Sequence, residues 1–255
     1  MPKPKKLLAR EFAAGTRVIA SREMEAYFDA PIAYIYASVF LVLSCSTFMN
    51  AFFLNGLVDM SPFFEVLPFL LILFIPAITM RVWAEERANN TYELLMTLPL
   101  QPLQIVLGKY TAALLFYLIV LAGSLPIVAM LFYLGEPDPG LIIGSYVGSL
   151  LLGALFLAFG LFVSALTRDQ IVAFVLAALL GFILIFSGHS KVVEVLDGLV
   201  PEMGVGTLLH DSISIVPHYT AFSKGIIGLG HTTYFFLISI LFIWMNEISL
   251  KRNRF

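Results

Sequence analysis

Long apolar runs separated by short polar stretches make up most of the chain. The hydrocarbon core of a bilayer is about 30 Å thick, so a helix that crosses it needs roughly 20 apolar residues. Charge-poor runs of about that length recur along the sequence. We therefore predict an all-α membrane protein with six transmembrane helices, at 31–58, 66–80 extended outward through Phe63, 110–135, 139–167, 170–190 and 225–246.

The composition agrees with a membrane protein. Hydrophobic residues make up 60% of the chain and charged residues 13%, whereas soluble domains are about a quarter charged. Cys45 lies in an apolar run, where a free cysteine usually packs as a small hydrophobic residue. The first long apolar run begins near Pro31, too late for a secretory signal. Nucleic acid is not an expected partner.

The basic residues predict the orientation, because positively charged loops stay in the cytoplasm. Six spans place both termini on one side. If that side is the cytoplasm, it holds 13 of the 15 lysine and arginine residues, and only Lys191 and Lys224 lie outside. The outer loops are acidic or neutral, as in GEPDPG at 135–140. The lopsided charge supports both the number of spans and the cytoplasmic placement of both ends.

The segments around the six-helix domain of residues 31–248 have distinct compositions. Residues 1–30 predict an amphipathic helix, which either lies on the inner membrane surface or docks a partner. Residues 249–255 form a basic cytoplasmic tail. Residues 188–224 are predicted to form short outer helices, interfacial or re-entrant. This outer segment either docks an extracytoplasmic accessory protein or covers a translocation path.

The segment at 80–109, between the second and third spans, carries the clearest local signals. Asn90 is followed three residues later by Glu93, which fits a capping box at a helix start. A short helix is therefore predicted to begin near Thr91. Pro99 ends it, because the residue before a proline is pushed out of helical geometry.

After this short helix, Pro102 suits the first turn of the next helix, which enters the membrane at Lys109. The short helix presents leucines to a partner's groove and lies where it can pass a partner's movement to the spans. An ordinary loop whose leucines fold back on the membrane is the alternative. The residues that we assign to the partner contact are Glu85, Glu86, Arg87, Asn90, Thr91, Glu93, Leu94, Leu95 and Leu98.

At these residues the chain resembles the ABC-2 family of transporter permeases, and in particular the branch associated with gliding motility. The resemblance is carried by FIPAITMRVWAEERANNTYELLMTLP at 74–99, QIVLGK at 104–109, DAPIAYIYASVFL at 29–41, LTRDQIVAF at 166–174 and FSKGIIGL at 222–229. The family pattern usually has glycine at the position of Asn90, and asparagine is one of the few other residues that accept left-handed geometry.

The resemblance implies a six-helix permease of the bacterial inner membrane that pairs with a second copy or a relative. Each permease is expected to dock one cytoplasmic ATPase subunit, which carries the ATP and Mg, so no cofactor is expected on this chain. In the family, the N-terminal amphipathic helix and the helix after the second span contact the ATPase. This adds Arg10, Glu11, Arg17 and Arg22 to the predicted interface. Export is the expected direction.

Several rival functions lack their motifs. The sequence has no G-x-x-x-x-G-K-[ST] loop for its own ATPase activity, and no H-E-x-x-H or G-x-S-x-G motif for a membrane-embedded enzyme. The spans hold no deeply placed carboxylate or lysine, which argues against a secondary transporter and favours an amphiphilic, lipid-linked or hydrophobic cargo. A non-transporting anchor that passes force to an extracytoplasmic partner remains the alternative.

Small residues form two rows in the fourth predicted span. Gly144 and Gly148 are four residues apart, and Ser145, Ser149 and Gly153 follow the same spacing. Rows of this kind let helices approach closely. They serve either a dimer or pathway surface, or packing within one subunit, and we favour packing.

Four histidines lie in or beside the outer segment, namely His189, His210, His218 and His231. Their spacings do not match metal-ligand pairs, and neither a cysteine nor a tight carboxylate cluster accompanies them. No metal site is predicted.

Overall fold

The structure of the chain, a computed structural model, describes residues 5–199 and 214–252. Every regular element within these ranges is a helix, so the predicted all-α fold is confirmed. In chain order the helices are α1 (Lys5–Asp29), α2 (Pro31–Asn55), α3 (Ser61–Ala88), α4 (Thr91–Thr97), α5 (Pro102–Ala122), α6 (Leu125–Leu134), α7 (Pro139–Leu166), α8 (Gln170–Phe186), α9 (Ser190–Leu199), α11 (Val216–Ser223) and α12 (Leu229–Arg252).

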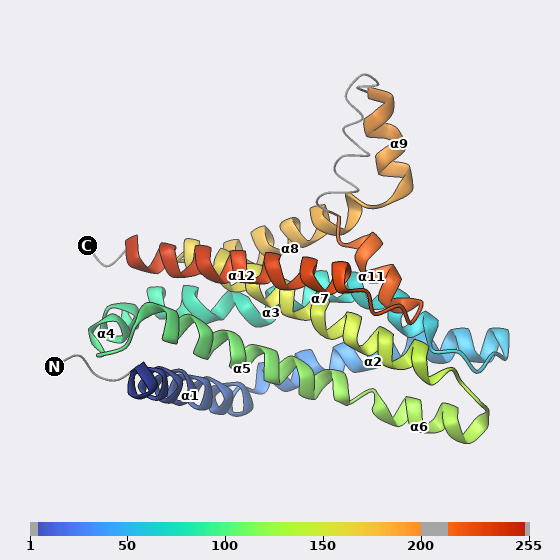
Figure 1. Ribbon diagram of the computed structural model, residues 1–255, viewed down its shortest axis with the longest axis horizontal. Coiled ribbons are helices and arrows are strands. Elements are labelled where there is room, and N and C mark those ends of the chain that lie inside the picture. The colour runs from blue at the N-terminus through green and yellow to red at the C-terminus, as the bar shows by residue number, and fades with distance from the viewer. Residues whose placement is uncertain (1–4, 200–213, 253–255) are drawn as a thin grey trace.

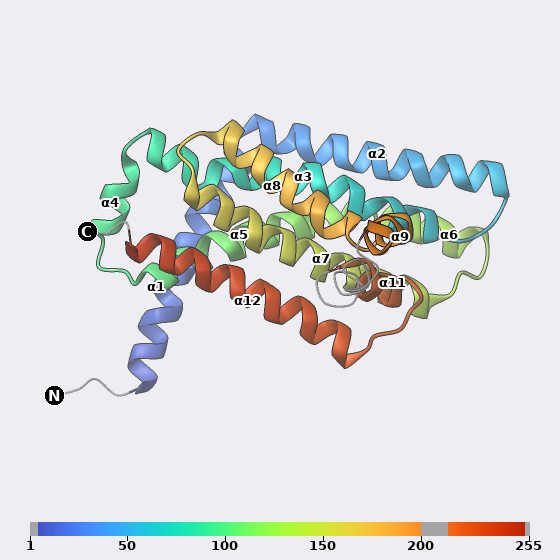
Figure 2. The same ribbon diagram turned by 90° about the horizontal axis from the view of Figure 1, so that it is seen from above.

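The long helices run side by side around a central pair, α3 and α7. These two pack against each other, while α8 contacts both of them and α12 packs on α7. The bundle is drawn lengthwise in Figure 1, where the two ends of the chain lie at the same end of the bundle. Figure 2 shows α1 running across that end instead of along the bundle. The chain therefore crosses from end to end an even number of times.

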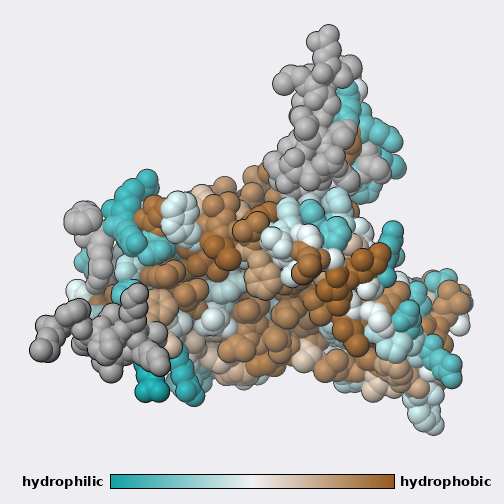
Figure 3. All heavy atoms as spheres, viewed as in Figure 1, coloured by the Kyte–Doolittle hydropathy of each residue, from teal (hydrophilic) through white to brown (hydrophobic). Residues whose placement is uncertain are grey.

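Five helices are long and apolar enough to cross a membrane: α2, α3, the α5–α6 pair, α7 and α12. The remaining predicted span, at 170–190, corresponds to α8, which is apolar but has only 17 residues. Figure 3 shows hydrophobic surface over the middle of the bundle and hydrophilic residues toward its ends. The chain is therefore a multi-pass membrane protein.

Most of the predicted spans have different limits in the structure. Helix α2 ends at Asn55 and α8 at Phe186, each a few residues early, and α12 runs from Leu229 to Arg252 instead of 225–246. Two further differences have a local cause. Helix α3 continues eight residues beyond Met80, because Arg81 and Glu85 pair one turn apart and extend the helix past the apolar run. The third span begins at Pro102 and breaks at Gly123–Ser124. Pro126 supplies no amide for the carbonyl four residues earlier, which explains why α5 does not continue directly into α6.

The predicted capping box at Asn90 is wrong. Asn90 adopts the left-handed conformation, with φ 57° and ψ 18°, and its side chain makes no capping hydrogen bond. Side-chain capping needs an extended backbone at the capping residue, whereas Asn90 makes the sharp turn between α3 and α4. The expectation that asparagine tolerates left-handed geometry here is confirmed. Pro99 lies just beyond α4 and Pro102 begins α5, as predicted.

The small residues of α7 lie against helices of the same chain. A Cβ atom on Gly153 would overlap the ring of Tyr117 in α5, and one on Gly148 would overlap the Phe222 side chain in α11. Gly144 faces the backbone at Gly225 in the same way. Ser145 and Ser149 are also fully buried. In the structure both rows serve close packing between α7 and its neighbours.

At the opposite end from the termini, α11 meets the start of α12. The Nδ1 atoms of His218 and His231 lie 2.8 Å apart, and the ring of Tyr234 stacks on His218 at 3.9 Å between centroids. His189 is exposed. His210 and the rest of 200–213, within the outer segment, lie outside the described residues, as do the last three residues of the basic tail.

Candidate functional site

A groove of about 700 Å³ opens at the end of the bundle that carries both termini. Helix α1 forms one wall, the last turns of α3 form the floor, and α4 forms the rim. The lining residues are Arg22, Glu23, Ala26, Tyr27, Ala30, Ile78, Arg81, Val82, Glu85, Glu86, Asn89, Thr91, Leu94, Leu95, Leu98 and Lys109. Two segments that are far apart in the sequence, residues 22–30 at the end of α1 and residues 78–98 of α3 and α4, thus enclose one cavity.

Lys109 of α5 lies beneath this groove with its charge paired twice. Its Nζ atom donates to Oε1 of Glu23 at 2.9 Å and to Oε1 of Glu86 at 2.8 Å. It also donates to the carbonyl of Val82 at 3.3 Å and lies 5.0 Å from the ring centre of Trp83. Only 1% of the Lys109 side chain is exposed. One buried ammonium group therefore joins α1, α3 and α5.

Arg22 completes the charge cluster from the solvent side. Its guanidinium donates to Glu23 at 3.1 Å and to Glu86 at 3.4 Å, which gives two positive and two negative charges. Buried charges are costly unless they are paired and hydrogen-bonded. The neutral cluster of Arg22, Glu23, Glu86 and Lys109, which we call the charge quartet, therefore favours one position of α1 on α3 and α5.

Next to Lys109, α1 also packs closely on α5. A Cβ atom on Gly108 would overlap Ile19, so glycine at this position lets α1 approach the α5 backbone. The side-chain amide of Gln104 donates to the carbonyls of Glu11 and Phe12 at 3.4 and 3.1 Å. These carbonyls lie on α1, which is therefore held by hydrogen bonds and by packing as well as by the charge quartet.

Helix α4 has an exposed face and a buried face. Leu94 and Leu98 are 69% and 40% exposed, whereas Leu95 is 4% exposed. Tyr92 is also buried, and its hydroxyl donates to the carbonyl of Leu250 in α12 at 3.4 Å. The guanidinium of Arg87 lies 5.1 Å from the centre of the Tyr92 ring. The short helix is thus fixed to α3 and α12, and two leucines stay available at the rim.

The structure brings together only part of the predicted interface. Glu85, Glu86, Thr91, Leu94 and Leu98 line the groove. Leu95 also borders it but packs inside its own chain, against the expectation that it is available to a partner. Glu86 bonds to Lys109 and Arg22, and Arg87 packs on Tyr92. Asn90 and Glu93 are exposed beside the rim.

On α1, Arg22 is the member of the predicted N-terminal interface that lines the groove. Arg10, Glu11 and Arg17 are exposed farther along the same helix. Tyr27, which also lines the groove, has its pKa raised by burial and secondarily by Glu23, so its hydroxyl keeps its proton. The wall of the groove that α1 provides therefore comes from the second half of that helix, from Arg22 onward.

Sequence reasoning missed the role of Lys109 and did not identify Glu23 at all. Lys109 looked like a basic residue at the entrance of a span, and its burial follows only from the way α1 crosses over α5. The available signal was that GKY at 108–110 places a lysine inside an apolar helix with glycine beside it. Such a lysine needs a carboxylate partner.

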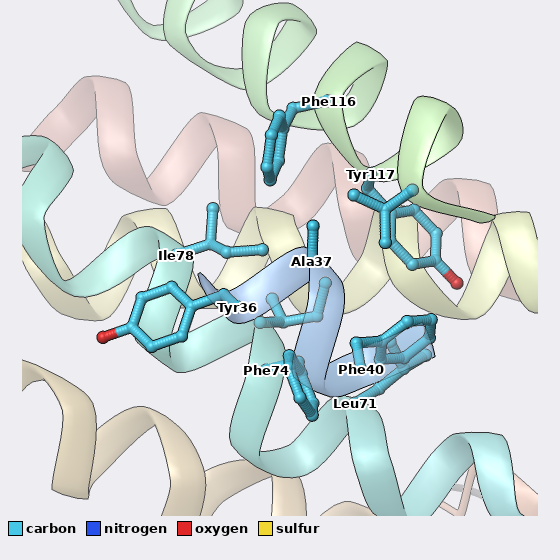
Figure 4. A pocket seen from close by; sticks show the side chains of 10 residues that line it. Tyr36, Ala37, Phe40, Leu71, Phe74, Ile78, Phe116 and Tyr117 are labelled. Carbon is cyan, nitrogen blue, oxygen red and sulfur yellow. The ribbon is translucent and has the colours of Figure 1, made fainter. Parts of the chain in front are cut away.

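A second cavity lies between α2, α3 and α5 and has a different character. Figure 4 shows the rings of Tyr36, Phe40, Phe74, Phe116 and Tyr117 around it. Its volume of about 10 Å³ is no larger than a single water molecule requires. This space is a packing gap, and the groove at the end of the bundle is the better candidate site.

The groove is suited to contact with a protein. Its rim carries two exposed leucines, Leu94 and Leu98, and the acidic groups of its floor are ion-paired with Lys109 and Arg22. An apolar segment of a partner can therefore cover the leucines while the charges beneath stay paired. Among the residues that the structure describes, no group of three or more His, Cys, Asp or Glu residues is arranged to hold a metal ion.

Comparison with known proteins identifies a family. The sequence pattern of a family described as ABC-2 family transporter protein matches residues 49–246, which is most of the chain. A search among curated proteins gave no match.

Proposed function

Because the chain belongs to the ABC-2 family of transporter proteins, we propose that it is the permease subunit of an ATP-driven exporter, energised by separate cytoplasmic ATPase subunits. The ATPase carries the ATP and Mg. Two permeases, identical or related, pair in the membrane and each docks one ATPase. The gliding-motility branch stays a prediction from the sequence resemblance.

The observation that carries this proposal is the arrangement of α4 beside the groove. Leu94 of α4 and Leu98 directly after it are exposed, and α4 itself is fixed to α3 and α12. The floor of the groove is bonded to α1 and α5. A partner that presses on α4 or α1 therefore acts on several membrane helices together. The proposed interface consists of Glu85, Glu86, Arg87, Asn90, Thr91, Glu93, Leu94, Leu95 and Leu98, with Arg10, Glu11, Arg17 and Arg22 on α1, and Leu95 contributes from inside by supporting α4.

The proposed location is the bacterial inner membrane with both termini in the cytoplasm. The end of the bundle that carries the termini also holds the end of α3, the start of α5 and the connection between α7 and α8 (Figure 1). These segments contain Arg81, Arg87, Lys109 and Arg168. Basic residues of short loops stay on the cytoplasmic side, so this end and its groove face the ATPase. The apolar character of the spans supports a hydrophobic or lipid-linked cargo.

Co-expression with a candidate ATPase tests this function. We expect the wild-type chain to purify as a complex of two permeases and two ATPase subunits, and the double variant L94E/L98E to purify without the ATPase. Leu57, exposed in the connection between α2 and α3, provides the matched control. The L57E variant should retain the complex, because Leu57 lies at the other end of the bundle.

Complex mass and ATP hydrolysis separate the outcomes. A wild-type chain that never binds an ATPase would sink the proposal, and an L94E/L98E variant that binds normally would remove α4 from the interface. A complex that assembles, but whose ATP hydrolysis responds to an extracytoplasmic protein and never to cargo, would favour the force-transmitting anchor.

A further inference from the structure

Helix α3 contains a carbonyl group that its own helix cannot satisfy. Pro68 has no amide hydrogen, so the carbonyl of Phe64, four residues earlier, loses its helical donor. Phe64 is fully buried in the apolar part of the bundle, where no bulk water replaces the missing bond. An unpaired backbone group in such surroundings costs free energy, so another donor is needed.

The donor comes from α11, 155 residues away in the sequence. The hydroxyl of Tyr219 donates to the Phe64 carbonyl at 2.8 Å, and its oxygen lies 3.3 Å from the hydroxyl of Ser149 in α7. Tyr219 is only 4% exposed. The phenol therefore lies inside the bundle, with its proton directed at the one carbonyl that the proline frees.

The surroundings hold α11 in the position that this bond needs. Phe222, one turn after Tyr219, is fully buried and fills the space over Gly148 of α7. Gly225 follows α11 with a positive φ of 75°, and its backbone lies against Gly144. A side chain at Gly144 or Gly148 would push α11 outward and draw the Tyr219 hydroxyl away from α3.

We infer that Tyr219 is a positioning residue that replaces the amide missing at Pro68 and thereby makes α11 and the outer part of α3 move as one unit. The inference does not depend on what docks at the groove. It has a consequence for transmission, because α3 carries Glu86 of the charge quartet at its other end. A displacement of α3 at the groove therefore reaches α11 without passing through the connecting loops.

A double-mutant cycle tests this inference on the purified chain in detergent. Y219F removes the hydroxyl and keeps the ring, and P68A restores an amide that can satisfy the Phe64 carbonyl. The reporter is the rate of maleimide labelling at an introduced S145C, a fully buried position of α7 whose side chain lies against the Ser223 carbonyl of α11, in a C45S background. This cysteine can be labelled only when α11 moves away from α7. The unfolding midpoint temperature is the second readout.

We expect Y219F to raise the labelling rate about three- to eighteenfold when Pro68 is present, since hydrogen bonds of this kind inside membrane proteins are worth about 0.6 to 1.7 kcal/mol. In the P68A background the same change should raise the rate less than twofold. Y110F is the matched control, because Tyr110 also donates to a backbone carbonyl in α7, that of Ala154, which has an ordinary helical amide at Ala158. Its effect should be equal in both backgrounds.

Two results would overturn the inference. One is an effect of Y219F that is the same with and without Pro68, which would mean that Tyr219 acts only by packing. The other is a Y219F chain that labels and unfolds like the wild type. If Y219F alone does not fold, the P68A/Y219F chain is expected to fold, and failure of that chain as well would also count against the inference.

Discussion

Lys109 and Glu86, 23 residues apart in the sequence, meet at 2.8 Å beneath the groove. The bond joins α5 to the last turns of α3, and Glu23 brings α1 to the same ammonium group. Because the Lys109 side chain is almost fully buried, the pair is shielded from the solvent that weakens ion pairs at protein surfaces. The charge quartet is thus the place where α1, α3 and α5 are tied together.

Removal of the Lys109 charge should destabilise the chain strongly. K109M leaves the carboxylates of Glu23 and Glu86 close together with only Arg22 to offset them, and the loss of one partner from a buried ion pair costs about 3–5 kcal/mol. We expect a clear fall in the unfolding midpoint in detergent. Lys251 provides the control, since its pair with Glu247 has a lysine side chain that is 58% exposed. A K251M chain as unstable as K109M would contradict this account.

Adjacent leucines of α4 should behave in opposite ways. L95A removes a buried side chain and should cost about 2–5 kcal/mol of stability. L94A removes an exposed side chain and should change stability by less than about 0.5 kcal/mol. Thermal unfolding of the two variants in detergent measures the difference. Equal losses would show that α4 does not have the buried and exposed faces described above.

Alanine at Gly153 should be poorly tolerated. Its Cβ would overlap the Tyr117 ring, and overpacking of a close-packed site costs about 1–3 kcal/mol. Gly230 at the start of α12 has open space around it, and alanine is the better helix former there. We therefore expect G153A to lower the unfolding midpoint and G230A to leave it unchanged or raise it. The opposite order would contradict the close approach of α5 and α7.

The contact between α11 and α12 should weaken in acid. The pKa of His218 is lowered from its ordinary value of 6.5, first by burial and second by His231. The neutral form is therefore favoured in the folded chain, and its contribution to stability is present above pH 6.5 and is lost as the pH falls below it. Unfolding midpoints at pH 7.5 and pH 5 should differ more for the wild type than for H218F.

The aromatic ring in H218F preserves the stacking on Tyr234 but cannot be protonated. Acid also protonates carboxylates, but it does so equally in the wild type and in H218F. The difference between the two chains therefore isolates the effect of His218. A pH dependence that is the same in the two chains would show that His218 does not contribute.

Much of the architecture followed from local features of the sequence. Apolar runs of membrane length predicted the spans because lipid selects for length and hydrophobicity, both of which are local properties. Pro99 and Pro102 predicted the end of α4 and the start of α5 because a proline acts on its own turn. The left-handed turn at Asn90 was expected from the family resemblance, whereas the capping box predicted there from local spacing is not formed.

The sequence by itself determined that this chain is a helical membrane protein of the ABC-2 family. Both properties can be recognised from stretches of consecutive residues, namely apolar runs of membrane length and the sequence pattern of the family. The tertiary structure alone decided which charges and hydroxyls meet. Lys109 with Glu23, and Tyr219 with Phe64, are partners separated by 86 and 155 positions. Such pairs depend on how α1 crosses α5 and how α11 enters the bundle, and no local pattern of residues encodes those crossings.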